Sequence, residues 1–295
     1  MLYMRLSLFS ALFFIVGLLG LADSEKDVST TQISVIQLKN DGSIDWSQNE
    51  ISARGIGLSP VNEKDAAKVR VLAREAAITV AARNLVKIIH GVEIDSNQTV
   101  ENLMLVNDTI KTKVEGMVKG AVIKQEKDLG DGSYEVVMSV KIYGKAGLSE
   151  CISFNNKVTD TVLEYNPKAV VLNISHEKSV ETDVVEWTGI IIDCRGKKLL
   201  PTMEPCVLDT ADTLIYPNNQ IPKDYNMANG LVSYYTTVDA AIASRRVGVK
   251  PLVVKAIEVK GSNHPIISIE DALRINTVDK ECKIRSTFAV SFLLD

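Results

Sequence analysis

A long alanine-rich segment constrains the fold of this chain more than any other feature. The 28 residues from Glu63 to His90 carry apolar side chains at every third or fourth position, the spacing of one helical face. These residues are Val69, Leu72, Ala73, Ala76, Val80, Ala81, Leu85 and Ile88. At 1.5 Å per residue the helix is about 42 Å long. Because its alanines are small, we expect close packing against a sheet and hence an α+β unit.

Both ends of this helix carry recognisable signals. Asn62 is expected to cap the amino end, with Asp65 three residues later as in a capping box, and Gly91 is a stop signal after the last turn. Before the helix, Gly55 and Gly57 lack the third glycine and the strand-turn-helix order of a dinucleotide-binding loop. We therefore expect these glycines to allow a positive φ or a close approach of the helix to the strand.

Hydrophobic patterns on both sides of the helix predict the rest of an amino-terminal domain. The expected elements are strands over residues 33–38 and 51–57, a helix over 99–118, and a hairpin of strands over 121–129 and 134–143. Asn107 interrupts the apolar face of the second helix, and Gly130 and Gly132 mark the hairpin turn. The prediction for residues 23–147 is an α+β domain with a long helix packed on a small antiparallel sheet.

The pattern changes to short strands after a connecting helix and linker over residues 148–168. Strands are expected over 169–174, 187–194, 206–208, 213–216, 231–236, 252–259 and 284–294. Two short helices are expected over 238–246 and 270–275, and a surface loop over 218–229. The sequence thus predicts a second α+β domain over residues 169–295, with a mixed β-rich sheet and short helices.

The first 22 residues have the pattern of a secretory signal peptide. Arg5 precedes an apolar stretch over residues 6–21, and small residues stand before a polar segment. We predict cleavage between Ala22 and Asp23, export to the periplasm and no transmembrane segment in the mature chain; the alternative is an uncleaved membrane anchor. The first cysteine is Cys151, so the segment lacks the cysteine that a lipid anchor requires.

The expected export makes disulfide formation by the four cysteines possible. They are Cys151, Cys194, Cys206 and Cys282, and exported chains oxidise such thiols more often than cytosolic chains do. Cys194 and Cys206 flank a connection with one glycine and two prolines, and a bridge between them is a candidate disulfide. The alternative is four buried thiols, since a free cysteine packs as a small apolar side chain.

Charge and motifs exclude several function classes. The chain has 33 Lys and Arg against 37 Asp and Glu, a net charge of -4, and no basic cluster of the kind that binds nucleic acid. His90, His176 and His264 lack a second ligand at helical or strand spacing. Phosphate-loop, serine-hydrolase and zinc-protease motifs do not occur. Asp128 and Asp131 read as residues of a hairpin turn, not as calcium ligands. We expect no cofactor, no metal and no enzymatic activity.

The order of several segments resembles a known family. They are 42–46 (GSIDW), 51–57 (ISARGIG), 73–77 (AREAA), 82–85 (ARNL), 90–92 (HGV), 116–121 (GMVKGA) and 131–136 (DGSYEV). This layout resembles the lipoprotein-20 family of bacterial envelope proteins and is similar to the amino-terminal part of flagellar assembly protein T. Weaker likeness continues through 187–193, 247–252 and 270–272. The resemblance implies an exported noncatalytic envelope protein, but this chain lacks the lipid-bearing cysteine.

Two functional hypotheses follow from these observations. The first is a periplasmic structural or interaction component that contacts an envelope or flagellar-base protein, linked to flagellar or outer-membrane assembly. The alternative is a protein that binds a small ligand or glycan in a cleft between its domains. In that case Tyr225, Tyr234 and Tyr235, with the loop over 218–229, are the candidates to stack on a sugar.

Overall fold

The structure is a computed structural model that describes residues 34–152, 186–217 and 223–295. Residues 32–295 form one compact unit. The expected signal peptide, its cleavage site between Ala22 and Asp23, the strand over 169–174, most of the linker and His176 lie outside the described residues. None of the helices in the described ranges combines the length and apolar character that a membrane crossing requires.

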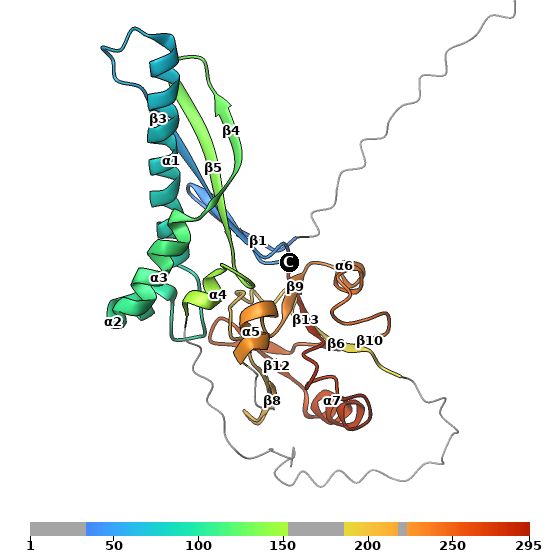
Figure 1. The fold of residues 1–295 in the computed structure, drawn as a ribbon. Helices are drawn as coiled ribbons and strands as arrows, with labels where there is room; N and C mark the ends of the chain where they lie inside the picture. Colours follow the sequence, from blue (N-terminus) through green and yellow to red (C-terminus); the bar gives the residue numbers. More distant parts are fainter. Residues whose placement is uncertain (1–33, 153–185, 218–222) are drawn as a thin grey trace, which may run out of the picture. The chain divides into compact units, whose positions relative to one another are not determined.

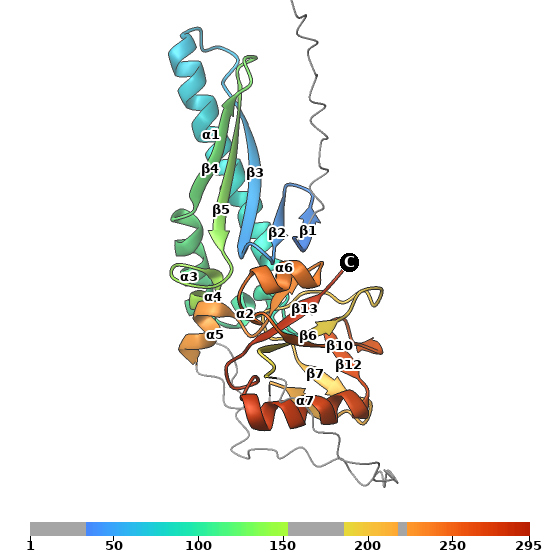
Figure 2. The same cartoon turned by 90° about the vertical axis from the view of Figure 1, so that its right-hand side faces the viewer.

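The amino-terminal region is a five-stranded antiparallel sheet with one long helix on it (Figure 1). The strand order is β1-β2-β3-β5-β4. The strands are β1 (Ile36–Lys39), β2 (Gly42–Asp45), β3 (Glu50–Leu58), β4 (Val122–Asp128) and β5 (Ser133–Lys141). Figures 1 and 2 both show α1 (Ala66–His90) running along β3 and β5. The predicted long helix on a small antiparallel sheet is confirmed.

Two glycines in β3 allow α1 to lie this close. A Cβ added at Gly55 would lie 2.2 Å from the backbone nitrogen of Ala81, and one at Gly57 would lie 2.2 Å from the carbonyl oxygen of Ala73. Both distances are far below van der Waals contact, so any larger residue forces the helix off the sheet. Of the two roles expected for these glycines, the close approach of helix and strand is the correct one.

The predicted cap of α1 was wrong by one turn. Asp65, not Asn62, is the N-cap, and its side chain accepts hydrogen bonds from the backbone N–H groups of Ala67 and Lys68. The helix ends at Gly91 as predicted, where the glycine N–H donates to the carbonyls of Ile88 and Ile89.

The second predicted helix is divided into two at Asn107. The parts are α2 (Val100–Val106) and α3 (Asp108–Lys119), and the Asn107 side chain accepts hydrogen bonds from Thr109 N–H and Ile110 N–H. A side chain that caps a new helix competes with continuation of the old one, so the single helix over 99–118 is corrected. The predicted hairpin is confirmed as β4 and β5, with Gly130 and Gly132 at positive φ.

The carboxy-terminal region follows α4 (Leu148–Cys151) and has its strands in two four-stranded sheets. One is parallel, in the order β10-β6-β13-β9, and the other is mixed, in the order β11-β12-β7-β8. The strands are β6 (Gly189–Asp193), β7 (Val207–Asp209), β8 (Leu214–Tyr216), β9 (Ser233–Tyr235), β10 (Pro251–Lys255), β11 (Glu258–Lys260), β12 (His264–Ile267) and β13 (Val290–Leu293). The predicted β-rich region with short helices is confirmed.

Three details of this region differ from expectation. The predicted strand over 252–259 divides into β10 and β11, which belong to different sheets. Part of the expected loop over 218–229 is the helix α5 (Lys223–Asn229). The other helices are α6 (Val238–Ala243) and α7 (Ile269–Cys282), and α7 is longer than predicted because Val278 and Cys282 continue its apolar face against the core.

The parallel sheet has apolar side chains on both faces. Ile191 and Leu293 pack against α6, while Ile190 and Ile192 belong to the larger core together with Ile275 of α7. Figure 2 shows α6 and α7 on opposite sides of this sheet. A parallel sheet needs such cover because both faces are apolar.

Direct contacts join the amino-terminal and carboxy-terminal regions. Ser34 forms an antiparallel bridge with Tyr235 at the β9 edge, and the Ser47 hydroxyl donates to the Tyr234 carbonyl at 2.5 Å. The Trp46 and Tyr234 rings meet edge to face with centroids 5.6 Å apart. The domain boundary proposed between residues 147 and 169 stays a prediction.

Candidate anion-binding cavity

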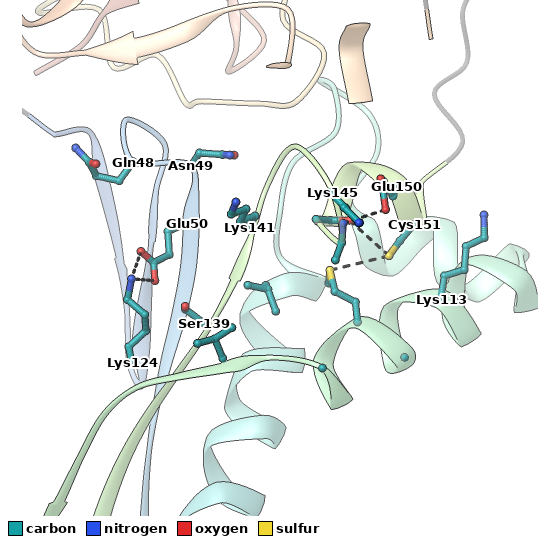
Figure 3. A pocket seen from close by; sticks show the side chains of 17 residues that line it. Gln48, Asn49, Glu50, Lys113, Lys124, Ser139, Lys141, Lys145, Glu150 and Cys151 are labelled. Carbon is teal, nitrogen blue, oxygen red and sulfur yellow. Dashed lines mark hydrogen bonds and ion pairs between the residues drawn. The ribbon is translucent and has the colours of Figure 1, made fainter. Parts of the chain in front are cut away.

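A cavity of about 810 Å³ lies at the end of the amino-terminal sheet where β3 begins and β5 ends (Figure 3). Its walls come from the start of β3, the carboxy-terminal half of α3, β4, the end of β5 and the segment leading into α4. The size falls in the range of small-ligand sites, roughly 300–1,000 Å³. It is about twice the size of two other hollows, of about 380 and 390 Å³, and more titratable side chains line it than line either of those.

Lysines dominate the charge around this cavity, which we call the lysine cavity. Four ammonium groups line it, those of Lys113, Lys124, Lys141 and Lys145, against the carboxylates of Glu50 and Glu150. The sequence as a whole has a net charge of -4, so this local excess of cations runs against the overall balance. Such a concave concentration of one sign attracts ligands of the opposite sign.

Only one of the four lysines has an ion pair among the described residues. Lys124 Nζ lies 3.2 Å from Glu50 Oε1, as Figure 3 shows. The second carboxylate, Glu150, accepts a hydrogen bond from the Ala146 backbone N–H at 3.0 Å. Within the described residues, Lys113, Lys141 and Lys145 have no ion pair, so three cations are available to a ligand there.

The deeper walls of the lysine cavity are apolar and small. Val140 and Cys151 are buried, Met117 is half-buried, and Gly116 and Gly120 present bare backbone. The Ser139 hydroxyl also lines the cavity; this side chain is 6% exposed, and no hydrogen bond to it is found within the described residues. The site thus offers ammonium groups, a buried hydroxyl and aliphatic surface together.

Local structure explains how the lysines converge. α3 ends at Gly120, whose N–H donates to the carbonyls of the last turn, and the chain then turns into β4. The register of β4 against β5 shifts between Ile123 and Gln125, which leaves Lys124 as the extra residue of a bulge. A bulge redirects the side chain that it carries. Sequence reasoning missed this site because the four lysines lie on separate elements.

Cys151 is the titratable sulfur of the lysine cavity. Its Sγ lies 4.0 Å from the Met117 Sδ and 3.8 Å from the Gly147 carbonyl oxygen. Burial raises the pKa of this thiol, and the nearby Lys113 opposes that shift only in part. Cys151 is therefore a protonated thiol that lines the site, and it is not a thiolate nucleophile.

The two cysteines proposed for a disulfide contact different groups. All four cysteines of the chain are thiols in the structure. Cys194 Sγ lies 3.7 Å from the Ile192 carbonyl oxygen, and Cys206 Sγ lies 3.0 Å from His264 Nδ1. Cys151 and Cys194 are buried and Cys206 and Cys282 are half-buried, and the disulfide between Cys194 and Cys206 stays a prediction.

Cys206 and His264 belong to an acidic cluster where the two regions meet. His264 Nε2 lies 3.1 Å from Ser96 Oγ, and the Glu204 backbone N–H donates to the Ile94 carbonyl at 2.7 Å. Burial, and then the charge of Asp95, raise the pKa of Cys206 to about 12 and that of Glu204 to about 7. The Cys206–His264 pair therefore lacks the thiolate that a nucleophilic cysteine requires.

Metal ligation finds no support in the described ranges. No group of three or more histidine, cysteine, aspartate or glutamate side chains there could hold a metal ion. The Asp128 and Asp131 side chains accept hydrogen bonds from backbone N–H groups in the β4–β5 turn, as predicted.

The three tyrosines proposed for glycan stacking divide between two environments. Tyr234 is buried, and its hydroxyl donates to the Thr202 carbonyl at 2.8 Å. Tyr225 and Tyr235 do come together, lining an open hollow of about 390 Å³ with Arg245. Neighbouring residues of a strand point to opposite faces, so Tyr234 and Tyr235 cannot stack on one ligand.

Comparison with known proteins covers the carboxy-terminal region alone. Residues 189–295 match the family model described as Treponema pallidum Tp0624, second domain. The match begins at β6 and continues to the last residue, just over a third of the chain. No curated protein matches the sequence at a significant level. The similarity does not extend to the lysine cavity, whose assignment rests on its own geometry.

Proposed function

We propose that this protein is an exported, noncatalytic component of the cell envelope that binds an acidic ligand in the lysine cavity. The observation that carries the proposal is the set of three cations around a concave site that have no ion pair with any residue of the described ranges. Neighbouring ammonium groups repel one another, and a bound anion relieves that repulsion. An anion also gains from partial exclusion of water, because electrostatic attraction strengthens as the effective dielectric falls.

The location and biological setting of the proposal rest on the sequence. The signal peptide over residues 1–22 supports export to the periplasm, and the resemblance of residues 42–145 to the lipoprotein-20 family supports a role in the envelope. The same resemblance supports a link to flagellar or outer-membrane assembly through an envelope partner. Fractionation of cells that produce the full chain tests this setting: recovery in the cytoplasm with an intact amino terminus contradicts it.

Calorimetric titration with organic anions tests the binding itself. We expect a carboxylate or phosphate ligand to bind the native chain and its affinity to fall as salt rises. The triple variant Lys113→Gln, Lys141→Gln and Lys145→Gln should lose this binding. The matched control changes Lys111, Lys119 and Lys127 to Gln, which removes the same charge from exposed positions outside the cavity. Equal loss in both variants, or no anion binding by the native chain, contradicts the proposal.

Glycan binding in the carboxy-terminal hollow is the second candidate function. The observation that favours it is the convergence of Tyr225 and Tyr235 beside Arg245. An aromatic face and a cation together suit an acidic sugar. Thermal unfolding with acidic envelope saccharides, compared between the native chain and Tyr235→Ala, tests this candidate; equal shifts in both contradict it.

A further inference from the structure

The lysine cavity combines two kinds of surface at different depths. The ammonium groups belong to exposed residues, whereas Val140 and Cys151 are buried, and Met117 is half-buried between them. Figure 3 shows the lysines on several sides of the site. The Met117 and Cys151 sulfurs lie 4.0 Å apart. A ligand that fills this site meets cations at the mouth and aliphatic surface inside.

The inner surface favours a flexible aliphatic group over a ring. None of the 17 side chains that line the cavity is aromatic. Nucleobases are commonly held by stacking on aromatic side chains, and the hollow at Tyr225 and Tyr235 shows that the protein has aromatic residues elsewhere. Methionine packs well against varied aliphatic shapes because it is unbranched and polarisable.

Gly116 shows that the space beside this turn of α3 is open. Glycine inside a helix destabilises it by about 1 kcal/mol relative to alanine. At Gly55 and Gly57 the packing of α1 explains the missing Cβ, but a Cβ added at Gly116 meets nothing within 4 Å. Packing therefore does not account for Gly116, and its backbone is among the groups that line the cavity.

We propose that the lysine cavity binds an anionic amphipath, a carboxylate or phosphate group joined to an unbranched aliphatic chain. Lys113, Lys141 and Lys145 attract the anionic group. The chain packs against Met117 and the open backbone at Gly116. This inference rests on the proposed function, since it names the chemical class of the acidic ligand.

A chain-length series separates the aliphatic contribution from the charge. Calorimetric titration of the native chain uses butanoate, hexanoate, octanoate and decanoate, each below the concentration at which it forms micelles. Burial of each added methylene should tighten binding about fourfold until the chain fills the cavity. Inorganic phosphate and citrate serve as compact anions, and decyltrimethylammonium as a cation with the same tail; we expect the cation not to bind.

The outcomes distinguish the two proposals. If phosphate, citrate and all four carboxylates bind with equal affinity, the aliphatic assignment is wrong and the anion-binding function stands. If no anion binds, both fail. Vesicles of phosphatidylglycerol separate a free amphipath from a lipid headgroup in a membrane. Binding of the vesicles without binding of decanoate overturns the inference, because surface charge then explains the attraction.

Two substitutions at Gly116 locate the chain within the cavity. Gly116→Leu fills the open space beside α3, and Gly116→Ala is the matched control, because an added Cβ meets no atom there. We expect Gly116→Leu to weaken decanoate binding by at least about tenfold, the equivalent of roughly two lost methylenes. Butanoate binding should change little, and Gly116→Ala should bind decanoate almost as the native chain does. Native affinity for decanoate in a folded Gly116→Leu variant, verified by thermal unfolding, contradicts the inference.

Discussion

The cations of the carboxy-terminal region and those of the lysine cavity are used in different ways. Arg246 donates to three backbone carbonyls, those of Phe288, Asn229 and Gly230, at 2.6–3.0 Å. Arg285 is buried and lies 3.0 Å from an Asp279 carboxylate oxygen. Both guanidinium groups thereby hold segments of the fold together. In contrast, Lys113, Lys141 and Lys145 are exposed and have no ion pair in the part of the chain that the structure describes.

This difference separates structural charge from charge that is available for binding. A buried cation must find its partners within the fold, since an unpaired buried charge is strongly unfavourable. Exposed cations around a cavity can stay unpaired at little cost because water solvates them. Substitution of a buried, paired cation should therefore lower the free energy of unfolding. Substitution of an exposed cation around the cavity should instead lower the affinity for a ligand.

Arg285→Met should give the largest loss of stability. It removes the partner of the half-buried Asp279 carboxylate and two further hydrogen bonds, to the Ile215 carbonyl and the Asn276 side chain. We expect the free energy of unfolding in urea to fall by about 3–5 kcal/mol.

The control for Arg285 is Arg195→Met. Arg195 pairs with Asp193 at 2.7 Å, but its side chain is 44% exposed, so the loss should stay below about 1 kcal/mol. A similar small loss in both variants would show that burial does not decide the role of these cations.

Glu204→Gln should have an intermediate and pH-dependent effect. Burial raises the pKa of this carboxyl to about 7 in the folded chain, from 4.5 as the ordinary value. The folded chain therefore holds a proton that the unfolded chain releases between these values, and stability falls as pH rises from about 4.5 through 7. The full loss corresponds to about 3 kcal/mol at most.

Urea unfolding of the native chain and Glu204→Gln across pH 5 to about 8.5 measures this effect. The variant should be the more stable of the two above neutral pH, and the difference should vanish near the acid end. Taking the difference removes the contribution of His264, whose pKa burial lowers and which is present in both chains. Glu115→Gln changes an exposed carboxylate of α3 and is the control. Parallel pH curves for the native chain and Glu204→Gln would contradict the assignment.

Elements with a strong period were predicted well from the sequence. The 3.6-residue period and the Gly91 stop located α1, and alternation with a glycine-rich turn located β4 and β5. Asn107 shows where a periodic pattern alone fails. Its apolar neighbours continue the helical period, but its side chain accepts hydrogen bonds from the N–H groups of Thr109 and Ile110 and begins a new helix.

The lysine cavity could not be predicted in the same way. Its lysines follow no sequence period, because they converge only after β4 pairs with β5 and a bulge redirects Lys124. Gly116 looked like any helical glycine until the space beside it was known. The burial of Tyr234 was missed for a related reason: the alternation of β9 places Tyr234 in the core and Tyr235 at the surface.

The triple variant Lys113→Gln, Lys141→Gln and Lys145→Gln should have the smallest effect on stability. Because these side chains are exposed and lack ion pairs within the described residues, the free energy of unfolding without ligand should change by less than about 0.5 kcal/mol per substitution. Decanoate at about 100 times its dissociation constant should stabilise the native chain by about 2.7 kcal/mol and leave the triple variant unchanged. Urea unfolding with and without decanoate measures both effects. If the triple variant, measured without ligand, loses as much stability as Arg285→Met, these lysines stabilise the fold. They are then not available to bind an anion, and the proposal is contradicted.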